Sequence, residues 1–227
     1  QRMETGRPWV RAKLGMSLDG RTAMASGESQ WITGTEARRD VQRLRAQSSV
    51  IITGADTVIT DNARLTVRPE ELGLSGDALQ WATVRQPQRV VIDSQLRVPL
   101  DAPFFQAGSA TVATAKPIPV AYEQAGHTVL SLPARDGRVD LTELLRRLAE
   151  QGANEVLIEA GPCLVGAFAA QGLIDEYWLY MAGRFLGSSA KPLVDWPIER
   201  MADAPYLTIH EVRPVGKDWR IKARPER

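Results

Sequence analysis

The chain is poor in the two residue types that most often bind transition metals. Of its 227 residues, one is cysteine (Cys163) and two are histidine (His127 and His210). A single thiol excludes an intramolecular disulfide and any zinc site built on several cysteines. The two histidines lack the close spacing of a ligand pair, so no histidine metal site is expected. So little cysteine agrees with a reducing compartment, and we expect a cytoplasmic protein.

Long apolar runs and an excess of one charge are also missing. No apolar stretch approaches the roughly 20 residues that span a bilayer, and the charged start QRMETGRPWVRAK is unlike a signal peptide. Lys and Arg number 28 against 27 Asp and Glu, for a formal net charge of +1. We therefore expect no membrane association and no recruitment of nucleic acid by an overall field.

Several common catalytic motifs are absent. The sequence has no GxSxG elbow, no Walker loop and no HExxH, and Cys163 has no histidine near it in the chain. The chain is nevertheless long enough, and at 44% hydrophobic apolar enough, to bury a substantial core. The chemistry must therefore come from a less common arrangement.

What the sequence does contain is an alternation of short apolar runs and amphipathic stretches. Strands are predicted over 9–18, 49–55, 89–94, 110–115, 127–132, 154–161 and 175–185, with helices over 33–47, 140–151 and from Pro162. The last two apolar–polar segments, 204–216 and 218–225, are joined by a glycine-containing turn and predict an antiparallel hairpin. This order predicts a single α/β domain with a mostly parallel mixed sheet flanked by helices.

Local signals set the expected boundaries of these elements. Thr33 followed by Glu36 fits a capping box at a helix start, and Asp140 followed by Glu143 fits another. The stretch from 57 to 69 is polar and is expected to be a loop. Residues 1–7 are interpreted as a tail or the end of a linker, and 8–227 as the domain.

The carboxyl ends of the predicted strands carry the candidate site residues, because ligands collect there in open α/β sheets. One strand ends at Glu159, and a helix starts at Pro162 after Gly161. The free N–H groups of such a first helical turn favour an anion, and Gly161 and Gly166 would allow it to approach closely. A glycine–proline helix start without a ligand is the more common case, so this signal alone is weak.

Basic residues offer a second group of candidates. Arg68, in the loop after the 49–55 strand, could hold a phosphate by two points, and Arg45 could join it, although arginines in loops and at helix ends are more often only solvated. Lys13 alternates with apolar neighbours, and its side chain points either to solvent or into a cleft. Trp31 stands in the polar stretch GESQWITG, so its ring is either a structural peg or a ligand contact.

Five segments occur in an order that resembles one known family. They are KLGMSLDGRTAMASGESQWITG, TGADTVITDNARLTVRP, RVVIDS, IEAGPCLVGAF and YWLYMAGRFLGSSA. Together they resemble the reductase domain of the bacterial bifunctional deaminase/reductase of riboflavin biosynthesis, over about residues 7–224. The resemblance implies a dihydrofolate-reductase-like fold and reduction of the ribosyl group of 5-amino-6-(5-phosphoribosylamino)uracil to ribityl, with NADPH as the hydride donor.

The resemblance also implies a set of site residues. NADPH would meet Gly15, Trp31, Thr57, Asp61, Ser94 and the turn of Gly161, Pro162, Cys163, Leu164, Val165, Gly166 and Ala167. The substrate would meet Ser29, Arg45, Leu65, Arg68 and Glu159, with Arg45, Arg68 and Ser29 on its 5-phosphate. Lys13, Asp61 and Glu159 are the expected catalytic groups, although which of them handles which proton stays open. Ser29 and Trp31 would face one side of an extended backbone.

The family's zinc deaminase signature, HxE followed by PCxxC, does not occur in this sequence. We expect this chain to be a reductase domain without deaminase activity. Two alternatives are kept, namely a pterin or folate reductase on the same fold and a non-catalytic nucleotide-binding remnant. The aromatic strand YWLYM and an exposed antiparallel end favour a homodimer.

Overall fold

The computed structural model of this protein describes residues 1–117 and 119–226. The strands of the main sheet are β1 (Trp9–Ser17), β3 (Val50–Gly54), β4 (Gln88–Ile92), β5 (Thr111–Thr114), β6 (Thr128–Ser131), β9 (Glu155–Ile158), β10 (Glu176–Ala182), β12 (Leu207–Val215) and β13 (Asp218–Pro225). The helices are α1 (Arg2–Thr5), α2 (Thr35–Gln47), α3 (Ala55–Asp61), α4 (Gly76–Thr83), α5 (Pro103–Gln106), α6 (Val120–Gln124), α7 (Leu141–Glu150) and α8 (Pro162–Ala170). Two short ribbons, β2 (Arg21–Ala23) with β11 (Lys191–Pro192) and β7 (Ala134–Arg135) with β8 (Arg138–Val139), and 3₁₀ turns at Pro69–Glu71 and Met201–Asp203 complete the described elements.

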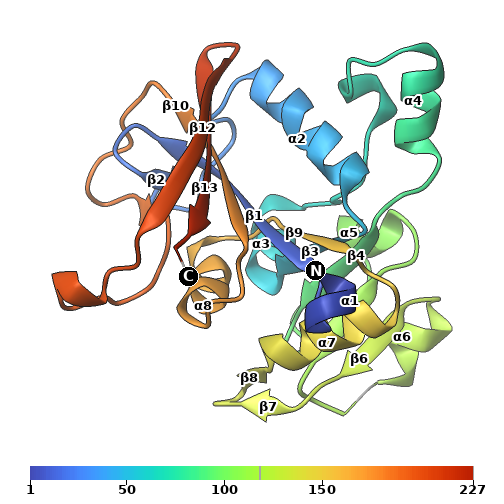
Figure 1. The fold of residues 1–227 in the computed structure, drawn as a ribbon. Helices are drawn as coiled ribbons and strands as arrows, with labels where there is room; N and C mark the ends of the chain where they lie inside the picture. The colour runs from blue at the N-terminus through green and yellow to red at the C-terminus, as the bar shows by residue number, and fades with distance from the viewer. Residues whose placement is uncertain (118, 227) are drawn as a thin grey trace.

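The main sheet has the order β12-β13-β10-β1-β9-β3-β4-β5-β6 across the described residues (Figure 1). Its strands run parallel from β10 to β6. At the other end, β13 and β12 are antiparallel to their neighbours. The predicted α/β class, with a mostly parallel mixed sheet and a C-terminal antiparallel hairpin, is confirmed.

Helices cover both faces of the parallel part of the sheet. On one face, leucines of α7 (Leu144, Leu145) and Phe168 of α8 pack with the strands in one buried cluster. On the other face, α2, α3, α5 and α6 contribute to a second cluster that contains Leu44 and Phe104. Because the central strands are buried on both sides, their sequences are continuous apolar runs, as the sequence predicted.

The two predicted helix caps differ in outcome. The Asp140 side chain accepts a hydrogen bond from the Glu143 backbone N–H at 3.0 Å, as the capping signature predicts. The capping box at Thr33 and Glu36 is wrong, because α2 has Gly34 as its N-cap and no side-chain cap. The Gly34 N–H instead donates to the Asp218 carboxylate at 2.6 Å, so the first residue of β13, far away in the chain, binds the start of α2 where the local sequence does not.

One other expectation needs correction. Residues 57–61 belong to α3 and are not loop, because a helix starts directly after β3 at Ala55. Residues 2–5 form a short helix, and the Arg7 guanidinium pairs with the Asp175 carboxylate at 2.6 Å, which holds the N-terminal segment against the domain. Among the described residues, no helix is long and apolar enough to cross a membrane.

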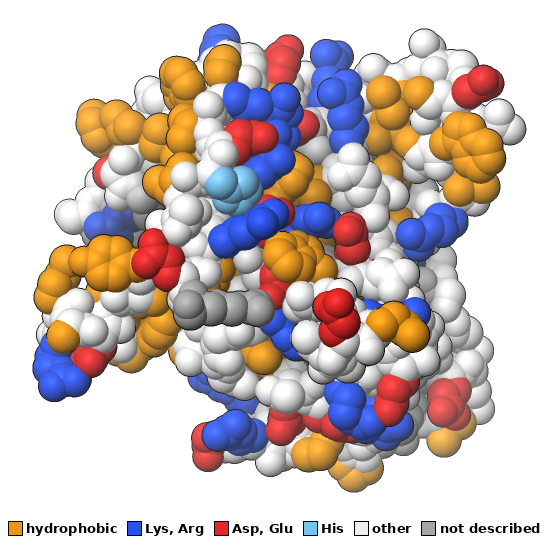
Figure 2. All heavy atoms as spheres, viewed as in Figure 1, with side chains coloured by type: hydrophobic (Ala, Val, Ile, Leu, Met, Phe, Trp, Pro, Cys, Tyr) orange, Lys and Arg blue, Asp and Glu red, His pale blue; other side chains and the backbone are white. Residues whose placement is uncertain are grey.

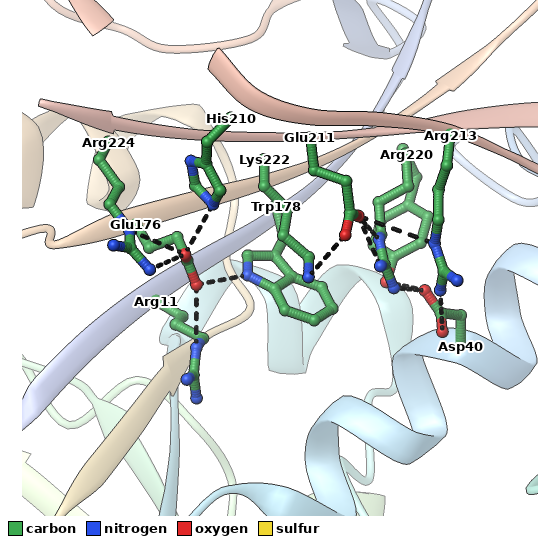
Figure 3. Close-up of polar contacts among 11 residues, drawn as sticks. Arg11, Asp40, Glu176, Trp178, His210, Glu211, Arg213, Arg220, Lys222 and Arg224 are labelled. Atoms are coloured by element: carbon green, nitrogen blue, oxygen red, sulfur yellow. Dashed lines mark hydrogen bonds and ion pairs between the residues drawn. The ribbon is translucent and has the colours of Figure 1, made fainter. Parts of the chain in front are cut away.

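A charged network covers one face of the antiparallel end (Figure 3). There, Trp178 of β10 lies under the cationic groups of Arg220 and Lys222, at 4.5 and 4.1 Å from its ring. Asp40 of α2 accepts from Arg220 at 2.6 Å, and Glu211 of β12 pairs with Lys222 at 3.2 Å. Figure 2 shows Lys and Arg side chains gathered over this end of the sheet with acidic side chains between them. The network ties α2 to the hairpin.

Candidate active site

A cleft of about 1400 Å³ opens at the carboxyl edge of the parallel strands. Its floor includes Lys13 and Gly15 of β1, Gly54 at the end of β3 and Glu159 after β9. Its walls come from α3, the start of α8, the β2–β11 ribbon and the β7–β8 ribbon. The site therefore lies where an open α/β sheet is expected to bind a ligand.

The centre of the cleft holds a buried ion pair. The Arg45 guanidinium, from α2, donates to both Glu159 carboxylate oxygens, at 2.6 Å from Nε and 3.0 Å from Nη2. Its third nitrogen donates to the Thr66 carbonyl at 3.0 Å. Both side chains are largely buried, at 13% and 8% exposure. A two-point pair of this kind fixes the orientation of the carboxylate as well as its charge.

Lys13 and Glu159 perturb each other's protonation. Burial lowers the pKa of Lys13, and the nearby Glu159 charge opposes this shift without cancelling it. Burial by itself would raise the pKa of Glu159, but Arg45 and Lys13 outweigh it and lower this pKa below its usual value. The cleft thus contains a carboxylate that stays ionised and an amine that loses its proton more easily than a free lysine.

Asp61, at the last residue of α3, is the second carboxyl group of the cleft. Burial raises its pKa, and the positive charge of Lys191 on β11 partly offsets the shift. Lys191 also lines the cleft. The sequence gives no sign of Lys191, because it lies in an irregular stretch, and only its pairing in the β2–β11 ribbon brings it here.

Trp31 lines the cleft and is 59% exposed. The Arg38 guanidinium covers it at 4.6 Å from the ring. The backbone at 29–32 is a turn closed by a hydrogen bond from Ile32 N–H to the Ser29 carbonyl at 3.0 Å, so the expectation of extended backbone is wrong. Ser29 and Trp31 line the cleft all the same. Trp31 is therefore not a buried peg.

The start of α8 closes another side of the cleft. Gly161 is the N-cap and Pro162 the first helical residue, as the sequence predicts. A Cβ added at Gly161 would have no described neighbour within 4 Å, so this position is open to a ligand. Gly166 does not line the cleft, because its Cα lies against the Asp195 backbone, where an added Cβ would be 2.8 Å from the carbonyl carbon. Its role is close packing and not access for an anion.

Most of the predicted site residues come together. Those that line the cleft are Lys13, Gly15, Ser29, Trp31, Arg45, Thr57, Asp61, Leu65, Ser94, Glu159, Gly161, Pro162, Cys163, Leu164 and Ala167. Val165, Gly166 and Arg68 do not line it. The Val165 side chain is buried in the core, and the Arg68 guanidinium pairs with Glu71 at 2.7 Å while 44% exposed.

Several polar residues of the cleft were not predicted. Arg97, Arg135 and Arg138 lie along the wall that contains Ser94, and Asp195 accepts from the Cys163 thiol at 3.1 Å. The Ser94 hydroxyl accepts from the Val139 N–H at 3.1 Å, which attaches the β7–β8 ribbon to the end of β4. These residues come from short ribbons and irregular segments, where the sequence carries no periodic signal.

Comparisons with known proteins find relatives of this chain over nearly its whole length. The riboflavin biosynthesis protein RibD of Escherichia coli (strain K12) is 47% identical over 221 residues, which cover 96% of this chain and 60% of that protein. The structure of RibD from Acinetobacter baumannii superposes with a TM-score of 0.88 at 39% identity, over 100% of this chain and 60% of that chain. The chain thus spans about 60% of the length of these relatives.

A more distant structure shows the fold alone. The riboflavin biosynthesis reductase Rib7 of Saccharomyces cerevisiae has a TM-score of 0.74 at 20% identity, over 98% of this chain and 91% of that chain. The RibD C-terminal domain family matches residues 8–221, which contain every segment that carried the resemblance. By this match and by its relatives, the chain belongs to the RibD C-terminal domain family.

Proposed function

We propose that this chain reduces the ribosyl group of 5-amino-6-(5-phosphoribosylamino)uracil to a ribityl group with NADPH, as a step of riboflavin biosynthesis. The observation that carries the proposal is the joint placement of Lys13, Asp61 and Glu159 in one cleft of a RibD C-terminal domain. Membership of the family supplies the reaction class, and the cleft supplies the groups that the reaction needs.

The cleft fits a dinucleotide in size and chemistry. Its volume of about 1400 Å³ exceeds that of an ordinary small-ligand pocket. The first turn of α8 presents free backbone N–H groups beside the open position at Gly161, which suits a phosphate. Gly15, Thr57, Ser94 and the exposed ring of Trp31 complete the proposed NADPH contacts. When bound, NADPH supplies the hydride that C1′ of the substrate receives.

The protein's own groups must open the ribose ring and manage its protons. We assign proton delivery to the ribose ring oxygen to Lys13, because its lowered pKa makes the ammonium a better donor than a free lysine. Glu159 stays a carboxylate and stabilises the positive charge that develops on the imine formed between C1′ and the amine nitrogen. Asp61 is assigned to orient the nicotinamide ribose. Leu65 packs against the pyrimidine side of the substrate.

The 5-phosphate of the substrate is assigned to Ser29, Arg45 and Arg68. Arg45 is already paired with Glu159, so its contribution to phosphate binding is mainly its positive charge. Arg68 lies just outside the cleft in a half-exposed pair with Glu71, and a phosphate would replace that carboxylate as its partner. An exposed pair of this kind is worth little, so the exchange costs about 1 kcal/mol or less.

The direct test is NADPH oxidation by the purified chain on adding the ribosylaminouracil phosphate. We expect oxidation that depends on this substrate and a ribitylamino product identified by mass spectrometry. Dihydrofolate is the control for the pterin or folate alternative and should give none. Tight NADPH binding without oxidation by any of these substrates would favour the non-catalytic remnant instead.

We also propose that the chain forms a homodimer through its antiparallel end. The face of the β12–β13 hairpin opposite the charged network carries Ile209, Val212 and Trp219, which are 59%, 56% and 45% exposed. β12 is also the edge strand of the sheet. An apolar face on an unpaired edge strand is a surface that soluble proteins normally cover.

A further inference from the structure

The segment 64–68 borders the cleft through one residue and is not part of any helix or strand. It carries Leu65, which lines the cleft at 5% exposure, and it ends at Arg68. Leu65 has a left-handed backbone with φ of 55°, which is unfavourable for a residue with a Cβ. Something outside the segment must therefore hold its backbone in place.

Gln86, in the loop between α4 and β4, binds the backbone of Val67 in this segment. Its side-chain oxygen accepts from the Val67 N–H at 2.8 Å, and its side-chain nitrogen donates to the Val67 carbonyl at 3.0 Å. A carboxamide has the same donor and acceptor as a peptide unit. The Gln86 side chain therefore binds both the N–H and the carbonyl of Val67, as the backbone of a neighbouring strand would.

Three other side chains bind the same segment at adjacent positions. The Arg89 guanidinium donates to the Arg64 carbonyl at 3.1 Å, and Arg45 donates to the Thr66 carbonyl at 3.0 Å. The Gln42 side-chain oxygen accepts from the Arg68 N–H at 3.0 Å. Gln42 is 2% exposed and lies on α2, which runs beside α4 (Figure 1). Backbone groups at four of the five positions 64–68 are thus fixed by side chains from α2, from β4 and from the loop between α4 and β4.

The geometry points to Gln86 as a positioning residue for the substrate, an inference that rests on the proposed function. Its two hydrogen bonds fix Val67, and through it the neighbouring Leu65 and Arg68, at the spacing that the pyrimidine and the ribosyl 5-phosphate of the substrate require. Gln86 does not line the cleft, so it affects the substrate only through the position of the segment 64–68. NADPH, whose assigned contacts lie on other elements, should not depend on it.

Gln86→Ala tests the inference, with Gln80→Ala of the neighbouring helix α4 as the matched control. Gln86 is exposed, so its removal should leave the fold intact. Losing two neutral hydrogen bonds should raise KM for the ribosylaminouracil phosphate about three- to tenfold. We expect kcat and KM for NADPH within about twofold of the unaltered chain. Gln80 is also exposed, and no hydrogen bond among the described residues joins its side chain to the segment, so Gln80→Ala should change neither constant.

Gln86→Glu provides a rescue that a merely structural loss would not show. An ionised Glu can accept from the Val67 N–H but repels the Val67 carbonyl, whereas a protonated Glu can make both hydrogen bonds. The KM of this variant relative to the unaltered chain should therefore fall as the pH is lowered toward about 5, near the range where Glu takes up its proton. Gln86→Ala should show no such trend.

Hydrogen exchange of the free protein separates the hydrogen bonds from their effect on catalysis. Gln86→Ala should speed exchange of the Val67 amide, and Gln80→Ala should not. Faster exchange with an unchanged substrate KM would overturn the positioning role while leaving the proposed function standing. Unchanged exchange would overturn the inference at its first step. Absence of substrate-dependent oxidation by the unaltered chain would overturn the proposed function and the substrate role of Gln86 together.

Discussion

The Arg45 guanidinium and the Glu159 carboxylate form a two-point ion pair that joins α2 to the carboxyl end of β9. The two residues are 114 positions apart in the chain. The pair is largely buried, and it sets both the charge and the orientation of the carboxylate assigned to the reacting carbon. Changes at this contact should therefore affect both the free energy of unfolding and the turnover of the chain.

The first prediction concerns Arg45→Met. Removing the guanidinium takes away the two-point partner of a buried carboxylate and leaves only the weaker influence of Lys13 and Arg68, which should lower the free energy of unfolding by about 3–5 kcal/mol. Urea denaturation followed by circular dichroism measures this. The double variant Arg45→Met with Glu159→Gln should be less destabilised than Arg45→Met alone, because the buried carboxylate charge is then removed together with its partner. Equal stability of the two variants would argue against the pair as described.

The second prediction separates stability from turnover at Lys13. Lys13→Met should lower kcat at least about a hundredfold, because a proton-transfer group contributes on the order of 10²–10⁴. The same variant should be no less stable than the unaltered chain, since burial disfavours the charged ammonium. Thermal denaturation with and without the substitution checks the second part.

The pH dependence of that stability difference has a defined sign. The pKa of Lys13 is lowered in the folded state, so the unfolded chain binds the proton more tightly. The contribution of Lys13 to the free energy of unfolding therefore rises as the pH increases from its pKa in the folded chain to its pKa in the unfolded chain, which is about 10.4. The advantage of Lys13→Met should be largest below this window and should shrink across it. A difference that grew with pH would contradict the lowered pKa.

The third prediction contrasts Gly161, the N-cap of α8, with Gly166 inside that helix. Gly166→Ala would force its methyl against the Asp195 backbone and should destabilise the fold by about 1–3 kcal/mol. Gly161→Ala meets no described atom within 4 Å and should leave the melting temperature nearly unchanged. Because Gly161 is an assigned cofactor contact, its variant should instead raise KM for NADPH. Calorimetry and steady-state kinetics on both variants test the contrast.

The fourth prediction concerns Trp31. If its exposed ring lies against NADPH, Trp31→Ala should weaken NADPH binding about fivefold or more, in line with the loss of a large aromatic contact. Trp81→Ala is the control, because Trp81 on α4 is 75% exposed and lies away from the cleft. Fluorescence titration with NADPH gives both affinities. Equal affinities in the two variants would remove Trp31 from the cofactor site.

The fifth prediction concerns the hairpin surface. Sedimentation velocity should show a dimer for the unaltered chain and a monomer for the paired substitution Ile209→Lys and Val212→Lys, because each places a charge on the apolar face. Val84→Lys, at a position 71% exposed outside the hairpin, should leave the dimer intact. A monomeric unaltered chain at micromolar concentration would refute the homodimer.

Sequence patterns were sufficient for the fold class and for the family. The buried parallel strands can be recognised in the sequence because both of their faces are covered. Such strands are continuous apolar runs, for example VIIT before Gly54. The Asp140 cap and the Pro162 helix start are local features, so their signals lie within a few residues. Where the controlling contact is distant, the local signal misleads: Asp218 caps α2, and Thr33 does not.

By itself, the sequence determined the order of the elements and the residue types at the strand ends, because both depend on neighbours in the chain. Only the tertiary structure decided how these residues meet. In the folded chain, Arg45 pairs with Glu159, and Lys191 lies near Asp61. Gly166 packs against the Asp195 backbone, and the Val67 backbone binds the Gln86 side chain. Each of these contacts joins segments that are close in space and far apart in the chain, and charge and hydrogen bonding act through space.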